Sequence, residues 1–142
     1  ARFAEQVLQA EGWTLERIRA VQHCIRAHRY RGEKENEPET IEAKVLFDAD
    51  KLDVLGAIGV ARTIGFAVQA GQPIYAEPTE QFVKEGVKQP DEPHSSYHEY
   101  LFKLRKVKNR LFTSSARQLA SARDAFLTEF YEQLRAEIKA ER

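Results

Sequence analysis

A cluster of charged side chains stands at the head of a long apolar segment. Residues 48–53 read Asp-Ala-Asp-Lys-Leu-Asp, and a run of apolar and small residues then continues to Gly71. Carboxylates and ammonium groups are costly to bury without a partner. A divalent metal held by a carboxylate, with Lys51 beside it to meet a phosphate, would provide that partner. The alternative is simple charge complementarity between the aspartates and the positive end of a helix.

Spacing relates the members of this cluster to one another. Asp50 and Asp53 are three residues apart, so on a continuous helix they point in roughly the same direction. Asp48 lies just before them, where it could cap a helix. The pattern therefore leaves both a ligand role and a capping role open.

Two histidines, His23 and His28, form the second candidate group. They are five residues apart, about 140° around an ideal helix, so they face one point only if the helix ends between them. Either histidine could bind a metal, donate to phosphate oxygens or act as a general acid. The alternative is a pair of partly exposed polar side chains. Cys24 is predicted to be a buried small residue rather than a nucleophile.

Cations provide a third set of candidates. Arg62 is a lone cation in the apolar run, where it either pairs with an aspartate or grips a substrate phosphate. A basic cluster further along is predicted to be a solvated helix face, with Lys103, Lys106 and Arg110 on one side. Its members are Lys103, Arg105, Lys106, Lys108 and Arg110. His94 and His98, just before the cluster, are weaker candidates for the site.

Composition limits the class of protein. The 142 residues, 42% hydrophobic and 31% charged, suit one globular domain over 1–142. Lysines and arginines balance aspartates and glutamates at 22 each, which argues against a general nucleic-acid-binding surface but not against a local basic pocket. One cysteine suits a reducing cytosol, so we expect a cytoplasmic protein. No stretch of about 20 apolar residues is free of charge, so no membrane span is expected.

Helical periodicity without strand-like alternation predicts an all-α fold. Segment 1–10 reads as the tail of a helix ended by Gly12. Thr14 is the expected cap of a helix that runs to near His28, and Pro38 is expected to begin the next helix. The segment 50–70 is apolar almost all round, which predicts one central buried helix ended by Gly71. Its glycines 56, 59 and 65 are expected to allow close approach of neighbouring helices.

The second half of the chain opens with a long irregular segment. Residues 72–95 hold four of the five prolines and are predicted to form a surface excursion. Ser95 or Ser96 is expected to cap a helix with a stripe at Tyr97, Leu101, Leu104 and Leu111. A final helix is predicted from Ser114 or Ser115. Its predicted inner face consists of Leu119, Phe126, Phe130, Leu134 and Ile138.

Three runs of the sequence resemble a known family. They are His23 to His28, Glu42 to Asp53 with its Asp50-Lys51-Leu52-Asp53 ending, and Gly56 to Arg62. Together they resemble the HD-domain metal-dependent phosphohydrolases, and look closest to the stand-alone bacterial branch, which includes nucleotide pyrophosphohydrolases. The resemblance covers most of the chain and implies an HD-domain-like helical bundle.

The resemblance also implies roles for individual residues. Asp50 matches the family's final metal-binding aspartate, Lys51 would face the substrate phosphate, and Asp53 would support the site. His23 and His28 match histidines that contact phosphates or, in some members, a second metal. The resemblance implies a divalent metal as cofactor, and Mn²⁺, Mg²⁺, Fe²⁺ and Co²⁺ all remain open, because ligand type constrains the metal only loosely.

The sequence departs from the family pattern at its beginning. No His-Asp dipeptide occurs anywhere, and the family's first histidine is missing too, so three of the four expected metal ligands are absent. Because the first residues already read as mid-helix, we expect an N-terminally incomplete domain rather than a lost metal site. The chain by itself is then expected to bind metal weakly and to be inactive. Its uncovered apolar face over 41–70 would favour dimers or aggregates, which leaves a homo-oligomer open.

The predicted function is metal-dependent hydrolysis of a nucleotide or another small phosphate ester. In such a site the metal activates a water, while Lys51, Arg62 and a protonated histidine stabilise developing charge. The alternative is a non-catalytic helical module that binds a nucleotide or a protein partner through the basic pocket. A third interpretation is a purely structural bundle in which the aspartates only cap a helix.

Overall fold

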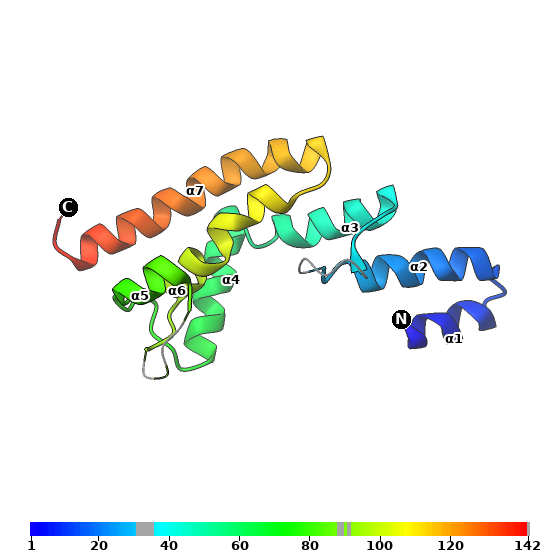
Figure 1. Ribbon diagram of the computed structural model, residues 1–142, viewed down its shortest axis with the longest axis horizontal. Helices are drawn as coiled ribbons and strands as arrows, with labels where there is room; N and C mark the ends of the chain where they lie inside the picture. Colours follow the sequence, from blue (N-terminus) through cyan, green and yellow to red (C-terminus); the bar gives the residue numbers. More distant parts are fainter. Residues whose placement is uncertain (31–35, 88–89, 91, 142) are drawn as a thin grey trace. The chain divides into compact units, whose positions relative to one another are not determined.

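The computed structural model describes residues 1–30, 36–87, 90 and 92–141. These residues form seven α-helices and one 3-10 helix, and none of them lies in a strand, which confirms the all-α prediction (Figure 1). The elements are α1 (Arg2–Ala10), α2 (Leu15–Ala27), α3 (Ile41–Leu52), α4 (Gly56–Gln69), α5 (Glu80–Glu85), α6 (Ser96–Phe102), η2 (Leu104–Arg110) and α7 (Ser114–Ile138). Within the described residues no single helix has the length and apolar composition of a membrane span; the bent pair α3 and α4 meets that test only when taken together.

The chain groups into two compact units. The first unit comprises residues 1–51 and 111–116, and the second comprises residues 52–110 and 117–142. The second unit holds the apolar cores of α4, α6, η2 and most of α7. Each predicted site residue can therefore be assigned to one unit.

The first two helices begin and end close to where local chemistry predicts. Gly12, with φ +72°, follows the end of α1, and the Thr14 hydroxyl accepts the Arg17 backbone N–H at 3.4 Å to cap α2. Helix α2 ends at Ala27, just before His28, as the sequence predicts. Cys24, predicted to be buried, is instead partly exposed.

Helix α3 begins later than predicted and buries a different face. Pro38 is buried before the helix, and the Thr40 hydroxyl accepts the Ala43 N–H at 3.2 Å at its start. The polar stretch from Arg29 to Pro38, which the sequence predicts to be a loop, lies partly outside the described residues. Phe47 is fully buried and packs edge-on against Phe112, with ring centroids 5.2 Å apart. Ile41, Val45 and Leu46 repeat in the sequence at a spacing that predicts one shared helix face, but they are 60%, 53% and 43% exposed.

Asp48 is a structural residue of the first unit. It is 2% exposed and accepts the N–H groups of Phe112 at 2.9 Å and Thr113 at 2.8 Å. Its carboxylate also accepts the Thr113 hydroxyl at 2.7 Å, while that hydroxyl accepts the Ala116 N–H at 3.2 Å in the first turn of α7. The carboxylate thus fixes the chain that enters α7, rather than capping its own helix.

The prediction of one buried helix over 50–70 is wrong in two respects. First, α3 ends at Leu52 and α4 begins at Gly56, whose φ of +66° favours glycine. A Cβ atom at Gly59 would lie 2.2 Å from the Val54 carbonyl oxygen, so this turn requires a glycine there. Second, α4 exposes one side, with Ile58 54% and Phe66 69% exposed. The close approach predicted for Gly65 is also wrong, because a Cβ atom there would meet nothing within 4 Å.

The segment 72–95 contains a short helix and is held by a buried polar network. Glu92 accepts the Thr79 N–H at 2.8 Å, and the Thr79 hydroxyl caps α5 at its Phe82 N–H. His98, which is fully buried, contacts the Glu92 carboxylate at 3.2 Å and the Ser95 hydroxyl at 2.7 Å. Ser95 also caps α6, as predicted. Buried groups in such a network are satisfied by one another rather than by water.

The last two predicted helices differ from the observed ones. The helix expected over 97–111 ends at Phe102, and the 3-10 helix η2 replaces the remainder. Helix α7 begins at Ser114 as predicted, but it buries Leu127 and Tyr131 instead of the predicted inner face. Leu119, Phe126 and Ile138 from that predicted face are 54%, 47% and 51% exposed. Tyr131 stacks on Tyr100 at 4.6 Å, and burial raises the pKa of the Tyr131 phenol, which keeps it neutral.

Candidate functional site

Lys51 lies at the centre of the candidate group in the first unit. Its ammonium group pairs with the Asp50 carboxylate at 2.5 Å and donates to the His28 carbonyl oxygen at 3.4 Å. The same ammonium group lies 4.7 Å from the centre of the Phe47 ring, a cation–π contact. The Lys51 side chain is 19% exposed and that of Asp50 is 51% exposed. The Lys51 ammonium group is therefore mostly shielded from solvent, while the Asp50 carboxylate faces solvent.

The two histidines of this unit have different hydrogen-bond partners. His28 caps α2, and its Nδ1 donates to the Ile25 carbonyl oxygen at 2.6 Å, which leaves Nε2 as the remaining ring nitrogen. A ring held in this way is typical of histidines that use the other nitrogen for a ligand or a proton transfer. His23 instead uses Nε2 to accept the Glu39 N–H at 3.1 Å. The contact of Lys51 with the His28 carbonyl joins His28, but not His23, to the Lys51–Asp50 pair.

Asp53 and Arg62 belong to the second unit. Arg62 donates to the Asp53 carboxylate at 3.4 Å and to the Asp53 carbonyl oxygen at 3.5 Å, and both side chains are more than half exposed. A long, exposed pair of this kind contributes little to stability. Arg62 can therefore leave Asp53 for another anion at little cost. Asp53 lies in the turn after α3, so the expectation that it shares a continuous helix with Asp50 is wrong.

A pocket of about 450 Å³ lies beside Arg62, within the second unit. Its volume lies in the range of sites that hold small ligands, about 300–1,000 Å³. Its lining comes from α4, α6 and the segments next to them: Val54, Arg62, Thr63, Phe66, Ala67, Gln69, Gln72, His94, Ser95, Ser96, Glu99, Lys103 and Leu104. The lining thus combines apolar walls with cations, hydroxyls and amides.

Charged groups of α6 face this pocket. Glu99 accepts from Lys103 at 2.7 Å and lies 3.7 Å from His94 Nε2. With Arg62 on α4, the lining has two permanent cations against one carboxylate, which makes it attractive to an anion. His98, weighed with His94 in the sequence, is buried in the network with Glu92 and Ser95 instead.

Most of these pocket residues carry no signal in the sequence. Phe66, Gln69 and Gln72 belong to no motif, and they read as parts of an apolar helix and a loop. Lys103 was predicted only as a member of the basic cluster, and Glu99 was not predicted at all. No spacing rule links α4 to α6, because their contact depends on tertiary packing.

The described residues do not by themselves fit a metal ion. No group of three histidine, cysteine, aspartate or glutamate side chains within the described part of the chain is arranged to hold one. Asp50 pairs with Lys51, which occupies the carboxylate with a competing cation. A carboxylate in that state is one ligand at most, and metal sites in proteins need several.

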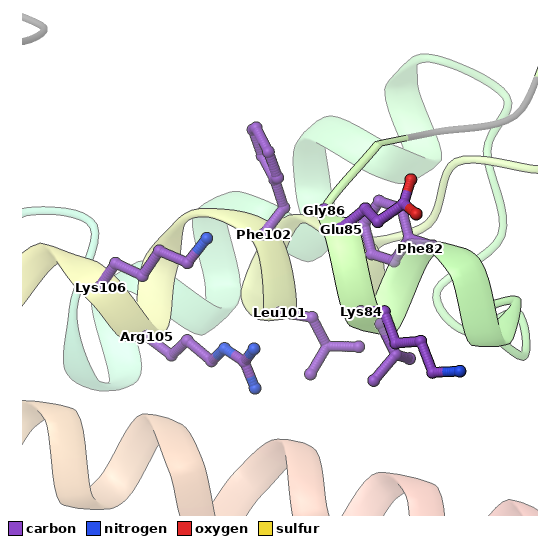
Figure 2. A pocket seen from close by; sticks show the side chains of 9 residues that line it. Phe82, Lys84, Glu85, Gly86, Leu101, Phe102, Arg105 and Lys106 are labelled. Carbon is purple, nitrogen blue, oxygen red and sulfur yellow. The ribbon is translucent and has the colours of Figure 1, made fainter.

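The basic cluster is exposed to solvent, as predicted, but residues 104–110 lie on the 3-10 helix η2 rather than on an α-helix. Lys108 pairs with Asp124 at 2.5 Å, while Lys106 lies over the Phe102 ring at 5.3 Å. Arg105 and Lys106 line a second, smaller cavity of about 140 Å³ together with residues of α5. Figure 2 shows the charged tips of Lys84, Arg105 and Lys106 apart from one another, so they do not meet at one anion.

Comparison of the sequence with known proteins gives one curated relative and no matching family model. The relative is YpgQ of Bacillus subtilis, described as an uncharacterized protein. It is 36% identical over 110 residues, which are 78% of this chain and 46% of YpgQ. The chain therefore spans about half the length of the curated relative that it matches.

Solved structures extend the comparison to the fold. The structure of B. subtilis YpgQ in complex with ADP matches with a TM-score of 0.73 and 28% identity, over 96% of this chain and 63% of that one. An HD-superfamily hydrolase of Bacillus thuringiensis matches with a TM-score of 0.56 and 34% identity, over 71% of this chain and 48% of that one. These similarities indicate an HD-like fold.

Proposed function

We propose that this chain belongs to a phosphohydrolase that acts on a nucleotide or another small phosphate ester, and that it supplies contacts to the substrate phosphate. The observation that carries the proposal is the pocket of about 450 Å³ lined by Arg62 on α4 and by Lys103, which directly follows α6. The similarity to an HD-superfamily hydrolase and to a protein crystallised with ADP supports the same chemistry. A cytoplasmic location, suited to a chain with one cysteine, is part of the proposal.

The proposal assigns roles to the residues that could meet a phosphate. The Arg62 guanidinium would exchange its long contact with Asp53 for a bidentate contact with phosphate oxygens. Separately, within the first unit, Lys51 would offer a cation to a phosphate, and His28 Nε2 would donate a proton to a phosphate or leaving oxygen. His23 would position the chain before α3 through its contact with Glu39.

A divalent metal enters the proposal only as a requirement of the whole protein. The described residues do not fit a metal, so no step is assigned to one here. Asp50 is the proposed ligand from this chain, with Mn²⁺, Mg²⁺, Fe²⁺ and Co²⁺ all open. Chelation tests this part, because a metal-dependent hydrolase loses activity with a chelator and recovers it when the ion is restored.

Calorimetric titration with ADP and with inorganic pyrophosphate tests the phosphate contacts. The Arg62→Gln variant should weaken both ligands by roughly tenfold to a hundredfold, because hydrogen bonds to charged groups contribute about 1.5–3 kcal/mol. Arg105→Gln is the matched control, since this arginine belongs to the same unit but lines the other cavity. Equal effects of the two substitutions, or no binding of either ligand, would contradict the proposal.

A second candidate function is a non-catalytic nucleotide-binding module. One observation favours it: Arg62 and Lys103 line one pocket with apolar walls, which suits binding of an anionic nucleotide whether or not it is hydrolysed. Nucleotide binding that is unchanged by a chelator, together with no hydrolysis by the full-length protein, would select the module. Hydrolysis that requires a metal would select the enzyme.

A further inference from the structure

The pocket between α4 and α6 has two chemically different ends. Ser96, at the start of α6, donates its N–H to the Pro73 carbonyl oxygen at 3.4 Å and its hydroxyl to the Ile74 carbonyl oxygen at 2.6 Å. Since Pro73 and Ile74 follow the end of α4, the start of α6 lies beside the end of α4. The two helices contact each other, and Val54, just before α4, lines the same pocket as Lys103 and Leu104, which follow α6.

This arrangement separates the cations from the amides of the lining. Lys103 follows the last residue of α6, so it lies at the same end of the pocket as Arg62 in the first half of α4. Gln69 is the last residue of α4, and Gln72 follows three residues later, so both lie at the opposite end. The pocket thus has a cationic end and an amide end.

Phe66 lies between these ends on the same helix face. Arg62, Phe66 and Gln69 follow a helical spacing of four and then three residues, which places them on one side of α4. With a rise of about 1.5 Å per residue, Arg62 and Gln69 are about 10 Å apart along the helix axis. That span is comparable to the reach of a nucleotide from its phosphates to its base.

We propose that this pocket holds a nucleoside phosphate in one orientation, with the phosphates between Arg62 and Lys103, the base on the Phe66 ring and the base edge against Gln69 and Gln72. This inference rests on the proposed function and adds the part of the substrate that is not phosphate. The Phe66 side chain is 69% exposed although it lines a pocket, so its ring is accessible to a base. A flat aromatic ring stacks on any base, while an amide offers both a donor and an acceptor to the base edge.

The one carboxylate of the lining is compatible with this orientation. Glu99 is already paired with Lys103 and lies near His94, so its charge is offset before a phosphate arrives. Arg62 is paired with Asp53 only by an exposed contact of 3.4 Å, which a phosphate can replace at little cost. The phosphate is therefore assigned to that end, and the amide end, where Gln69 and Gln72 carry no formal charge, is left to the base.

Titration of ADP and inorganic pyrophosphate into variants of the protein tests this orientation. Phe66→Ala should raise the Kd for ADP roughly tenfold, because stacking of one base contributes about 1–3 kcal/mol, and should leave pyrophosphate binding unchanged. Phe66→Trp keeps an aromatic face and should retain ADP binding. Val68→Ala is the matched control, since Val68 is 60% exposed on the same helix but does not line the pocket.

A separate variant tests the role of the Gln69 and Gln72 amides. The double variant Gln69→Ala with Gln72→Ala should reduce the preference among nucleoside diphosphates with different bases, while leaving pyrophosphate binding unchanged. Because Gln69 is exposed and Gln72 is only partly buried, this double variant is expected to fold and remains informative if Phe66→Ala is unstable.

The outcomes separate this inference from the proposed function. If Arg62→Gln weakens both ligands while Phe66→Ala and the double amide variant behave like Val68→Ala, the orientation is wrong and the phosphate role stands. If the unmodified protein binds neither ligand, the proposed function fails, and the orientation fails with it. Loss of ADP binding alone in Phe66→Ala, with recovery in Phe66→Trp, supports the orientation.

Discussion

Replacement of Asp48 by alanine should destabilise the protein far more than replacement of Asp50, two residues away on the same helix. Asp48 is 2% exposed, and its carboxylate accepts the N–H groups of Phe112 and Thr113 and the Thr113 hydroxyl. Alanine leaves two partly buried backbone donors without their acceptor. Each such donor costs about 1–3 kcal/mol, so the expected loss is roughly 3–5 kcal/mol.

Two further variants calibrate this value. Asp48→Asn keeps one carbonyl oxygen of similar shape but replaces the other acceptor with a donor, so about half of the loss is expected. Asp50→Ala removes a carboxylate that is 51% exposed and pairs only with its neighbour Lys51. An exposed pair of this kind contributes less than about 1 kcal/mol.

Urea unfolding followed by circular dichroism measures the three differences. The free energy of unfolding should fall in the order Asp50→Ala, Asp48→Asn, Asp48→Ala. Since small domains have only about 5–15 kcal/mol of stability, the alanine variant should unfold at a much lower urea concentration. If Asp48→Ala and Asp50→Ala shift the urea midpoint equally, the hydrogen bonds from Asp48 to residues 112–113 do not stabilise the first unit as argued.

Three other predictions concern the second unit. Lys108→Met should lower the free energy of unfolding in urea by about 1–3 kcal/mol, because it leaves the buried Asp124 carboxylate unpaired. Adding Asp124→Asn should restore part of this loss, and no recovery would argue against the ion pair. Gly59→Ala should be strongly destabilising, since its Cβ atom would lie 2.2 Å from the Val54 carbonyl oxygen, whereas the Cβ atom of Gly65→Ala meets nothing within 4 Å and should stabilise the protein by about 0.5–1 kcal/mol. The thermal unfolding temperatures of the two variants should therefore shift in opposite directions. Hydrogen bonds from Tyr75 and Lys139 hold the pKa of Glu77 below its usual 4.5, so the contribution of Glu77 to stability is present above that pH and is lost as the pH falls through the lowered value. Glu77→Gln should lower the free energy of unfolding by less than about 1 kcal/mol at pH 7 and not at all at acid pH. An equal loss at both pH values in urea unfolding would contradict this.

Helix ends were the part of the fold that local sequence predicted best. Thr14 and Ser95 cap the helices that they precede, and Gly71, with φ +67°, follows the end of α4. Each of these signals acts within a few residues, through a hydroxyl that accepts a nearby N–H group or a glycine that tolerates a positive φ. Such chemistry can be read from the sequence because both partners lie in the same short segment.

Buried faces were predicted poorly where the partner is distant in sequence. The stripe predicted for α3 is exposed, and α7 buries Leu127 and Tyr131 rather than Leu119 and Phe126. Both helices have apolar residues on more than one side, so periodicity alone cannot choose between the faces. The choice depends on which other elements are near, such as Tyr100, whose ring stacks on Tyr131.

The same distinction applies to the candidate site. The order of residues alone predicts a helical chain with carboxylates and a lysine at 48–53 and with Arg62 as a lone cation in an apolar run. The packing of the folded chain buries Asp48 and leaves Asp50 facing solvent, because one face of α3 is covered and the other is not. It also brought Lys103 into the pocket of Arg62, since the packing of α6 on α4 joins residues that no local spacing relates.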